Sequence, residues 1–221
     1  MFDNISGQYD TLNRVLSLGI DIGWRNTLVK QLDATNPTTI LDVATGTGDL
    51  AIAAYKPGRK ITGVDISTGM LNVGREKVKK RHLSPDITLV VGDSEALEFT
   101  DHSFDAVLAA FGVRNFENLE AGLTEMARVL KPGGFLGILE FGKPKSAIIR
   151  FGYNLYFTRV LPVIGKLVSR DLRAYTYLPE SVNAFPYGTA FTEILSRCGF
   201  AKPKTTPLTF GICQLYTATK I

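Results

Sequence analysis

The chain has 221 residues, of which 45% are apolar and 21% are charged, and its formal net charge is +4. This length and composition suit one globular domain with a modest insertion, and they exclude a disordered or low-complexity chain. No run reaches the roughly 18 apolar residues of a membrane-spanning helix. Residues 143–173 contain seven basic residues and one acidic residue, a local charge of +6, which indicates a local anionic partner: lipid, substrate or nucleic acid.

The hydrophobic pattern predicts short apolar strands that alternate with helices. Residues 1–36 have the spacing of amphipathic helix. Five apolar runs follow at 39–43, 61–64, 87–91, 104–110 and 135–141, and helices are predicted over 49–55, 67–81 and 119–130. The runs do not alternate with polar residues, which is typical of parallel strands covered by helices on both faces.

Residues 142–187 interrupt this rhythm with aromatic, proline and basic residues, and we expect them to form an inserted cap. A helix over 188–198 and two strands at 205–208 and 213–218 are predicted to follow. Terminal strands this close in sequence would run antiparallel. We therefore expect residues 1–221 to form one domain, with a helical lid at 1–36 and an insert at 142–187.

A glycine loop follows the first predicted strand, with Asp42 at the end of the strand and Gly46 and Gly48 in the turn. Glycine lets the backbone approach a ligand closely and adopt positive φ. Asp65 ends the second strand, 17 residues after Gly48, where a carboxylate can accept hydrogen bonds from both ribose hydroxyls. These two features predict a nucleoside site, but they do not separate a dinucleotide from S-adenosylmethionine.

The residues around the loop favour S-adenosylmethionine. In a dinucleotide site a third glycine would fall at Ala51, and Asp49 at the start of the helix would repel a pyrophosphate. A ligand without phosphate, carrying a sulfonium and an amino group, tolerates Asp42 and Asp49 better. The alternative is an ordinary strand-to-helix turn with a capping residue.

A third motif follows the predicted strand at 87–91. Asp93 could accept a hydrogen bond from the adenine amino group, and Ala96 could cover the adenine ring. Equally, Asp93 or Ser94 could cap a helix. The sequence leaves both interpretations open.

Together with the motif at residues 130–134, these features resemble the class I methyltransferases. The resemblance implies a Rossmann-like α/β fold whose mostly parallel seven-stranded sheet ends in an antiparallel hairpin. More specific patterns make the whole chain similar to the ubiquinone/menaquinone biosynthesis C-methyltransferases. They lie at residues 2–10, 13–19, 24–25, 111–115, 139–144, 177–181 and 185–186.

This resemblance implies C-methylation of a prenylated quinol ring by S-adenosylmethionine. The expected substrate is demethylmenaquinol, which would become menaquinol, and the alternative is a ubiquinol precursor. By position, Thr47, Asp65, Asp93 and Ser94 match the cofactor contacts of the family. Ala110 stands where some relatives have a serine, so that hydroxyl contact is absent.

No His–Asp pair offers an obvious base, and no metal site is expected because acid–His–Cys clusters are absent. We expect Arg114 and Asn115 to orient the quinol oxygen while Tyr9 closes over it. Arginine does not readily act as a base itself, but it can stabilise a phenolate. The alternative for Arg114 is a structural ion pair.

The insert at 142–187 combines aliphatic and aromatic residues with basic ones, which suits a prenyl tail beside an anionic membrane at its cytoplasmic face. A homodimer interface or plain core packing is the alternative. Basic residues among aliphatics disfavour nucleic acid as the partner. A non-catalytic regulator and a methyltransferase for another apolar small molecule remain as rival functions.

Overall fold

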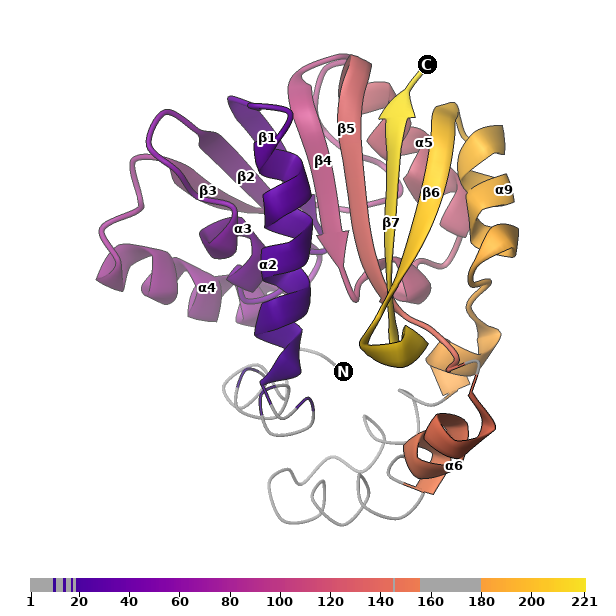
Figure 1. Ribbon diagram of the computed structural model, residues 1–221. Coiled ribbons are helices and arrows are strands. Elements are labelled where there is room, and N and C mark those ends of the chain that lie inside the picture. Colours follow the sequence, from indigo (N-terminus) through magenta and orange to yellow (C-terminus); the bar gives the residue numbers. More distant parts are fainter. Residues whose placement is uncertain (1–9, 11–13, 15–16, 18, 145, 156–179) are drawn as a thin grey trace.

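The computed structural model describes residues 10, 14, 17, 19–144, 146–155 and 180–221 (Figure 1). Its centre is a seven-stranded sheet in the order β3-β2-β1-β4-β5-β7-β6. The strands are β1 Thr39–Val43, β2 Lys60–Asp65, β3 Ile87–Val91, β4 Phe104–Ala110, β5 Leu130–Phe141, β6 Phe200–Leu208 and β7 Cys213–Lys220. Strands β1 to β5 pair in parallel, and β7 runs antiparallel to both β5 and β6. The predicted α/β class with a C-terminal antiparallel hairpin is confirmed.

Helices cover both faces of the sheet, which explains the uninterrupted apolar runs. One core lies between the sheet and α5 and α9, and the other lies between the sheet and α2, α3 and α4 (Figure 1). The helices are α2 Ile20–Asp33, α3 Asp49–Ala53, α4 Thr68–Lys80, α5 Leu119–Val129, α6 Ala147–Leu155 and α9 Thr189–Arg197, with 3₁₀ turns η1 Val113–Asn115 and η3 Thr209–Gly211. None of the described helices is long and apolar enough to cross a membrane.

The alternation of side chains along β1 decides which face of the sheet carries the side chain of Asp42. Leu41 and Val43 belong to the core under α5, and Ile40 belongs to the core under α2. Because side chains alternate with a period of two, Asp42 shares the face of Ile40. Ala110 at the end of β4 packs on the same core. The α2 face therefore receives side chains from the ends of both central strands.

The predicted helical segment at 1–36 contains helix α2, which begins at Ile20 after Gly19 in a left-handed conformation. Two predicted strands begin earlier in the structure. Strand β5 begins at Leu130 instead of residue 135, because Leu130 pairs with Phe104 before a register shift accommodates residues 131–134. Strand β6 begins at Phe200 instead of residue 205. It is an edge strand whose pairing shifts between Ala201 and Lys204, which makes room for a proline.

The order of the strands identifies the expected binding edge. Strand β2 lies on one side of β1 and β4 lies on the other. The chain therefore continues from β1 toward one edge of the sheet, to β2, and from β4 toward the opposite edge, to β5. Ligands of open α/β sheets bind outside the carboxyl ends of the strands at such a point. In Figure 1 the carboxyl ends of the parallel strands lie at the lower end of the molecule, where α6 also lies.

Candidate active site

The loop after β1 turns from strand to helix through three residues with positive φ. They are Ala44 at 53°, Gly46 at 56° and Gly48 at 76°. Gly48 is also the N-cap of α3 and has no side-chain cap. A non-glycine residue with positive φ carries strain, and such strain is concentrated at functional sites. The unusual backbone therefore belongs to the loop that the sequence singles out.

The buried side chain of Asp42 fixes this loop through hydrogen bonds. One of its carboxylate oxygens, Oδ2, accepts hydrogen bonds from the Thr45 hydroxyl at 2.6 Å and from the Ala51 backbone at 3.0 Å. The side chain is buried, with the residue 1% exposed, and the other oxygen, Oδ1, has no hydrogen-bond partner among the described residues. Burial raises the pKa of Asp42 to about 7, although the bonds from Thr45 and Ala51 oppose the shift. Asp42 thus presents a poorly compensated carboxylate beneath the loop.

Asp65 joins the end of β2 to the same loop. Its two oxygens accept hydrogen bonds from the backbone N–H groups of Gly46 and Ser67, each at 2.8 Å. The Gly92 N–H donates to the Asp65 carbonyl at 3.1 Å, which brings the turn after β3 alongside. In that turn, Asp93 accepts a hydrogen bond from the Glu95 backbone at 2.8 Å. The predicted ribose and adenine residues are therefore neighbours, at the ends of β2 and β3.

Thr47 connects the loop to the N-terminal segment. Its hydroxyl donates to the Asp10 carboxylate at 2.5 Å, and Lys77 of α4 pairs with Asp10 at 2.7 Å and also with Asp49. Gly74 has no side chain, which allows α4 to lie close to the loop. An added Cβ on Gly74 would lie 3.0 Å from the Thr47 backbone. Asp10 is thus held at the predicted cofactor loop by a hydrogen bond and an ion pair. Tyr9 lies outside the described residues.

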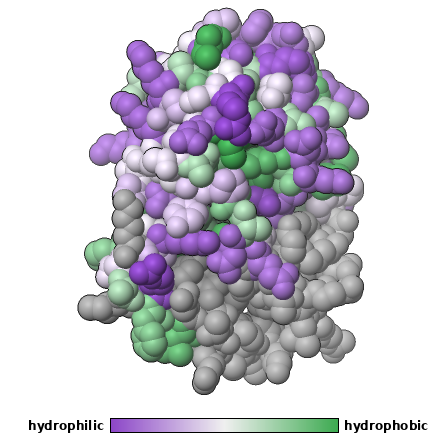
Figure 2. Space-filling model, turned by 90° about the vertical axis from the view of Figure 1, so that its right-hand side faces the viewer, coloured by the Kyte–Doolittle hydropathy of each residue, from purple (hydrophilic) through white to green (hydrophobic). Residues whose placement is uncertain are grey.

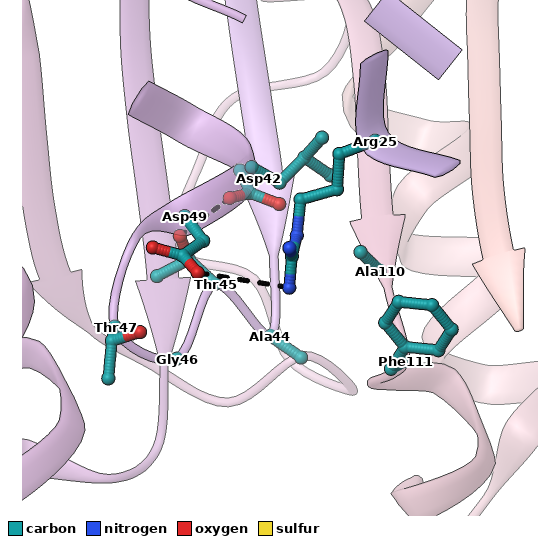
Figure 3. Close-up of a pocket in the computed structure, with 10 residues that line it drawn as sticks. Arg25, Asp42, Ala44, Thr45, Gly46, Thr47, Asp49, Ala110 and Phe111 are labelled. Carbon is teal, nitrogen blue, oxygen red and sulfur yellow. Dashed lines mark hydrogen bonds and ion pairs between the residues drawn. The ribbon is translucent and has the colours of Figure 1, made fainter. Parts of the chain in front are cut away.

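The end of β4 forms the opposite wall. A cavity lies between the two strand ends, lined by Arg25, Asp42, Ala44, Thr45, Gly46, Thr47, Asp49, Leu50, Ala110 and Phe111 (Figure 3). Phe111 also has a positive φ, of 58°. An added Cβ on Gly112 would lie 2.5 Å from the Cβ of Ala44, so only glycine lets the two loops meet. The cavity thus contains predicted cofactor residues from β1, its loop and β4, whereas Asp65, Asp93 and Ser94 lie outside its lining.

Arg114 lies in η1, directly after this wall, and forms a buried ion pair with Glu140 of β5. The two side chains approach to 3.1 Å, Glu140 is 0% exposed, and the Arg114 backbone N–H donates to the same carboxylate at 3.2 Å. Nη1 of Arg114 also donates to the Phe111 carbonyl. The ion pair that the sequence analysis gave as the alternative role of Arg114 is therefore present. It connects η1, which also contains Asn115, to strand β5. Within the described residues, no group of His, Cys, Asp and Glu could hold a metal ion.

Arg25 is a cavity residue that the sequence analysis did not propose for the site. Helix α2 carries it into the cavity, where Figure 3 shows its guanidinium between Asp49 and Phe111. The only sequence signal was the adjacent pair Trp24 and Arg25 within the family resemblance. Helical spacing alone does not reveal that this residue reaches the end of β1.

We predict that Asp42→Asn changes the pH dependence of stability. The native pKa of about 7 exceeds the usual value of about 3.9, so the native state holds a proton that the unfolded state loses. The free energy of unfolding of the wild type should therefore fall as pH rises from about 4 to about 7. The variant lacks this contribution, so its stability relative to wild type should rise by about 1–4 kcal/mol across that range. Urea unfolding at several pH values measures both proteins, and parallel pH profiles would contradict the prediction.

Solved structures share this fold at low sequence identity. A methyltransferase from Thermotoga maritima, described as S-adenosylmethionine-dependent and as a possible histamine N-methyltransferase, superposes with a TM-score of 0.68 at 18% identity, covering 100% of this chain and 98% of that chain. Phosphoethanolamine N-methyltransferase 2 of Haemonchus contortus, in complex with S-adenosyl-L-methionine, gives a TM-score of 0.64 at 18% identity, covering 92% of this chain and 57% of that chain. These similarities confirm the Rossmann-like methyltransferase fold.

Relatives at higher identity narrow the assignment. A demethylmenaquinone methyltransferase of Bacteroides fragilis is 51% identical over 100% of this chain and 91% of its own length. A ubiquinone/menaquinone biosynthesis C-methyltransferase UbiE of Geobacter sulfurreducens is 45% identical over 100% of this chain and 87% of its own length. The model of the ubiE/COQ5 methyltransferase family matches residues 1–220. The chain therefore belongs to the ubiE/COQ5 methyltransferase family.

Proposed function

We propose that this protein transfers the methyl group of S-adenosylmethionine to a ring carbon of demethylmenaquinol, which yields menaquinol. The observation that carries this proposal is the 51% identity, over the whole chain, to a protein named demethylmenaquinone methyltransferase. A ubiquinol precursor is the alternative substrate, because another full-length relative carries the combined ubiquinone/menaquinone name.

The residues present at the site fit S-adenosylmethionine. That molecule carries two cationic groups, a sulfonium and an α-ammonium, and no phosphate. Asp42 and Asp49 both line the cavity, and one buried oxygen of Asp42 has no hydrogen-bond partner in the part of the chain that the structure describes. Asp65 and Asp93, at the ends of β2 and β3, would hold the ribose and the adenine, and Thr47 and Ala110 would border the ligand at the two strand ends.

S-adenosylmethionine supplies an already activated methyl group, so the protein must position the quinol and help it become nucleophilic. A quinol carbon becomes nucleophilic when the neighbouring hydroxyl loses its proton. Arg114 and Asn115 follow the wall of the cavity formed by Phe111, and we assign them to orient that oxygen, with Tyr9 closing over it. The ion pair with Glu140 holds η1 rigidly for this task. Trp24, Phe111 and Phe141 pack together beside the cavity and would exclude water.

Mass spectrometry of the product tests the reaction. The protein is incubated with S-adenosylmethionine and either demethylmenaquinol or a ubiquinol precursor. We expect demethylmenaquinol to gain one methyl group and S-adenosylhomocysteine to appear in equal amount, with Asp65→Ala lowering turnover strongly. Methylation of the ubiquinol precursor alone would select the alternative, and methylation of neither would remove the quinol assignment.

The role of Arg114 needs a variant that separates catalysis from folding. Arg114→Ala alone would leave the Glu140 carboxylate buried without its partner, at a cost of about 3–5 kcal/mol in stability. The double variant Arg114→Gln with Glu140→Gln removes both charges and keeps polar groups of similar size. We expect it to unfold near the wild-type temperature, to bind S-adenosylhomocysteine normally, and to lose about 100-fold or more in kcat. Wild-type kcat in the double variant would reduce Arg114 to a structural role.

We further propose that the insert brings the protein into peripheral contact with an anionic membrane at its cytoplasmic side, where a prenylated quinol resides. In the described part of the insert, α6 exposes Phe151 and Leu155, which are 73% and 47% exposed, and Arg150 beside them is also exposed. Figure 2 shows an apolar patch at the lower end of the molecule, at the height of α6 in Figure 1, below a mostly hydrophilic face. An apolar surface next to basic residues suits the interface of an anionic bilayer.

Sedimentation with liposomes tests this contact. We expect binding to vesicles that contain phosphatidylglycerol, little binding to phosphatidylcholine vesicles, and a severalfold loss of binding in Phe151→Ser. Ile221→Ser is the matched control, because Ile221 is 70% exposed but lies at the opposite end of the molecule in Figure 1. Equal and negligible binding to both vesicle types would exclude the membrane. Dimerisation that Phe151→Ser abolishes, measured by sedimentation velocity, would assign the patch to a second copy of the chain.

A further inference from the structure

Within the described residues, Arg114 forms side-chain hydrogen bonds through only one of its three guanidinium nitrogens. Nη1 donates to the Phe111 carbonyl and to both carboxylate oxygens of Glu140, at 3.3 and 3.1 Å. Nε is buried without a hydrogen-bond partner in that part of the chain, and none of the described hydrogen bonds involves Nη2. The side chain is only 8% exposed, and a guanidinium buried in this way with donors unused is costly.

The ring of Phe141 offsets part of this cost. The central carbon of the Arg114 guanidinium, Cζ, lies over the Phe141 ring, 5.4 Å from its centroid. A cation within about 6 Å of a ring centroid is attracted by the negative face of the ring, and the attraction is stronger when water is excluded. This attraction does not require a hydrogen bond. It therefore stabilises a buried guanidinium whose N–H groups are not all used.

The end of β5 supplies both groups that hold the guanidinium, because Glu140 and Phe141 are consecutive residues of that strand. The Glu140 carboxylate binds Nη1, and it also accepts the backbone N–H of Phe141 at 3.2 Å. Contacts at one nitrogen fix that atom but leave the plane of the guanidinium free to turn about it. The ring of Phe141 is the second contact, and it fixes the plane.

The Phe141 ring is itself held from several sides. Its centroid lies 4.8 Å from that of Phe111 after β4 and 6.3 Å from that of Trp24 on α2. Trp24 donates a hydrogen bond through Nε1 to the Thr209 hydroxyl in η3, at 2.8 Å. Three segments that are distant in sequence therefore enclose the ring. A group supported by packing of this kind can hold a functional side chain in one geometry.

We propose that Phe141 is a positioning residue for the methyl transfer: its ring fixes the Arg114 guanidinium so that Nη2, which the described hydrogen bonds leave unused, is presented to the quinol oxygen. The inference rests on the proposed function, in which Arg114 orients that oxygen. In this role Phe141 acts only through Arg114. Without the ring, the guanidinium would stabilise the developing phenolate less well, because its donor would no longer be held in place before the reaction.

Steady-state kinetics with demethylmenaquinol tests this role. Phe141→Leu removes the ring and keeps an apolar side chain. We expect kcat to fall about 10-fold, while KM for the quinol and the affinity for S-adenosylhomocysteine change less than about twofold, because the lost interaction acts mainly in the transition state. Phe141→Tyr keeps the ring face and should restore kcat to within about twofold of the wild type.

Phe99→Leu is the matched control. Phe99 is also a partly buried phenylalanine in an aromatic pair, with its centroid 5.3 Å from that of Phe104, but its described ring contact is with another ring and not with a cation. The substitution should lower the unfolding temperature and leave kcat unchanged. If Phe141→Leu does not fold, as judged by thermal unfolding, Phe141→Met replaces it with the same expected loss of kcat.

A double-mutant cycle shows whether Phe141 acts through Arg114. In the background of Arg114→Gln with Glu140→Gln the guanidinium is absent, so Phe141→Leu should lower kcat less than about twofold. An equal loss in both backgrounds would mean that the ring only supports the wall, and unchanged kcat in Phe141→Leu would also overturn the proposal. Both results leave the proposed function intact, because the wild type still methylates the quinol. A wild type that methylates no quinol would reject both proposals.

Discussion

The site depends on one buried carboxylate. Oδ2 of Asp42 accepts hydrogen bonds from the hydroxyl of Thr45 and the backbone N–H of Ala51, so it connects the end of β1 to the glycine loop and to the helix α3 that follows it. Burial makes this ionised group costly, because little surrounds it to replace water. The loop is thereby held in a backbone conformation that Ala44, Gly46 and Gly48 adopt with positive φ. The burial of this carboxylate therefore lowers the stability of the folded protein at the strand ends, where a ligand would bind.

Charge also connects parts of the chain that are far apart in sequence. Lys77 of α4 contacts Asp10 from the N-terminal segment and Asp49 from the start of α3, and Asp10 in turn accepts a hydrogen bond from Thr47. These groups are partly exposed, so each pair contributes modestly to stability. Their position matters more, because they place Asp10 against the loop. On the opposite wall, the ion pair of Arg114 with the fully buried Glu140 fixes η1.

The family resemblance and the residues of the glycine loop both indicate S-adenosylmethionine as the ligand, but only the family resemblance indicates a substrate. Residues 1–220 match the family, and relatives that match the whole chain bear names that specify a quinone ring. The fold by itself is shared with methyltransferases named for other substrates. A fold positions a cofactor, whereas the substrate is set by residues around the site. For this chain we propose that those residues belong to η1, the N-terminal segment and the insert.

The sequence alone determined the strands at 39–43, 87–91 and 104–110, the glycine loop with Asp42, and the antiparallel ending. These are local signals: a strand buried on both faces is a short apolar run, and a tight turn needs glycine. Only the tertiary structure decided that Arg25 lines the same cavity as Asp42, that Arg114 pairs with Glu140, and that β5 begins at Leu130. Each of these depends on how a helix or strand packs against a distant segment. Periodicity assigns a residue to one face of its own element, but the partner on the other side is set by packing in three dimensions.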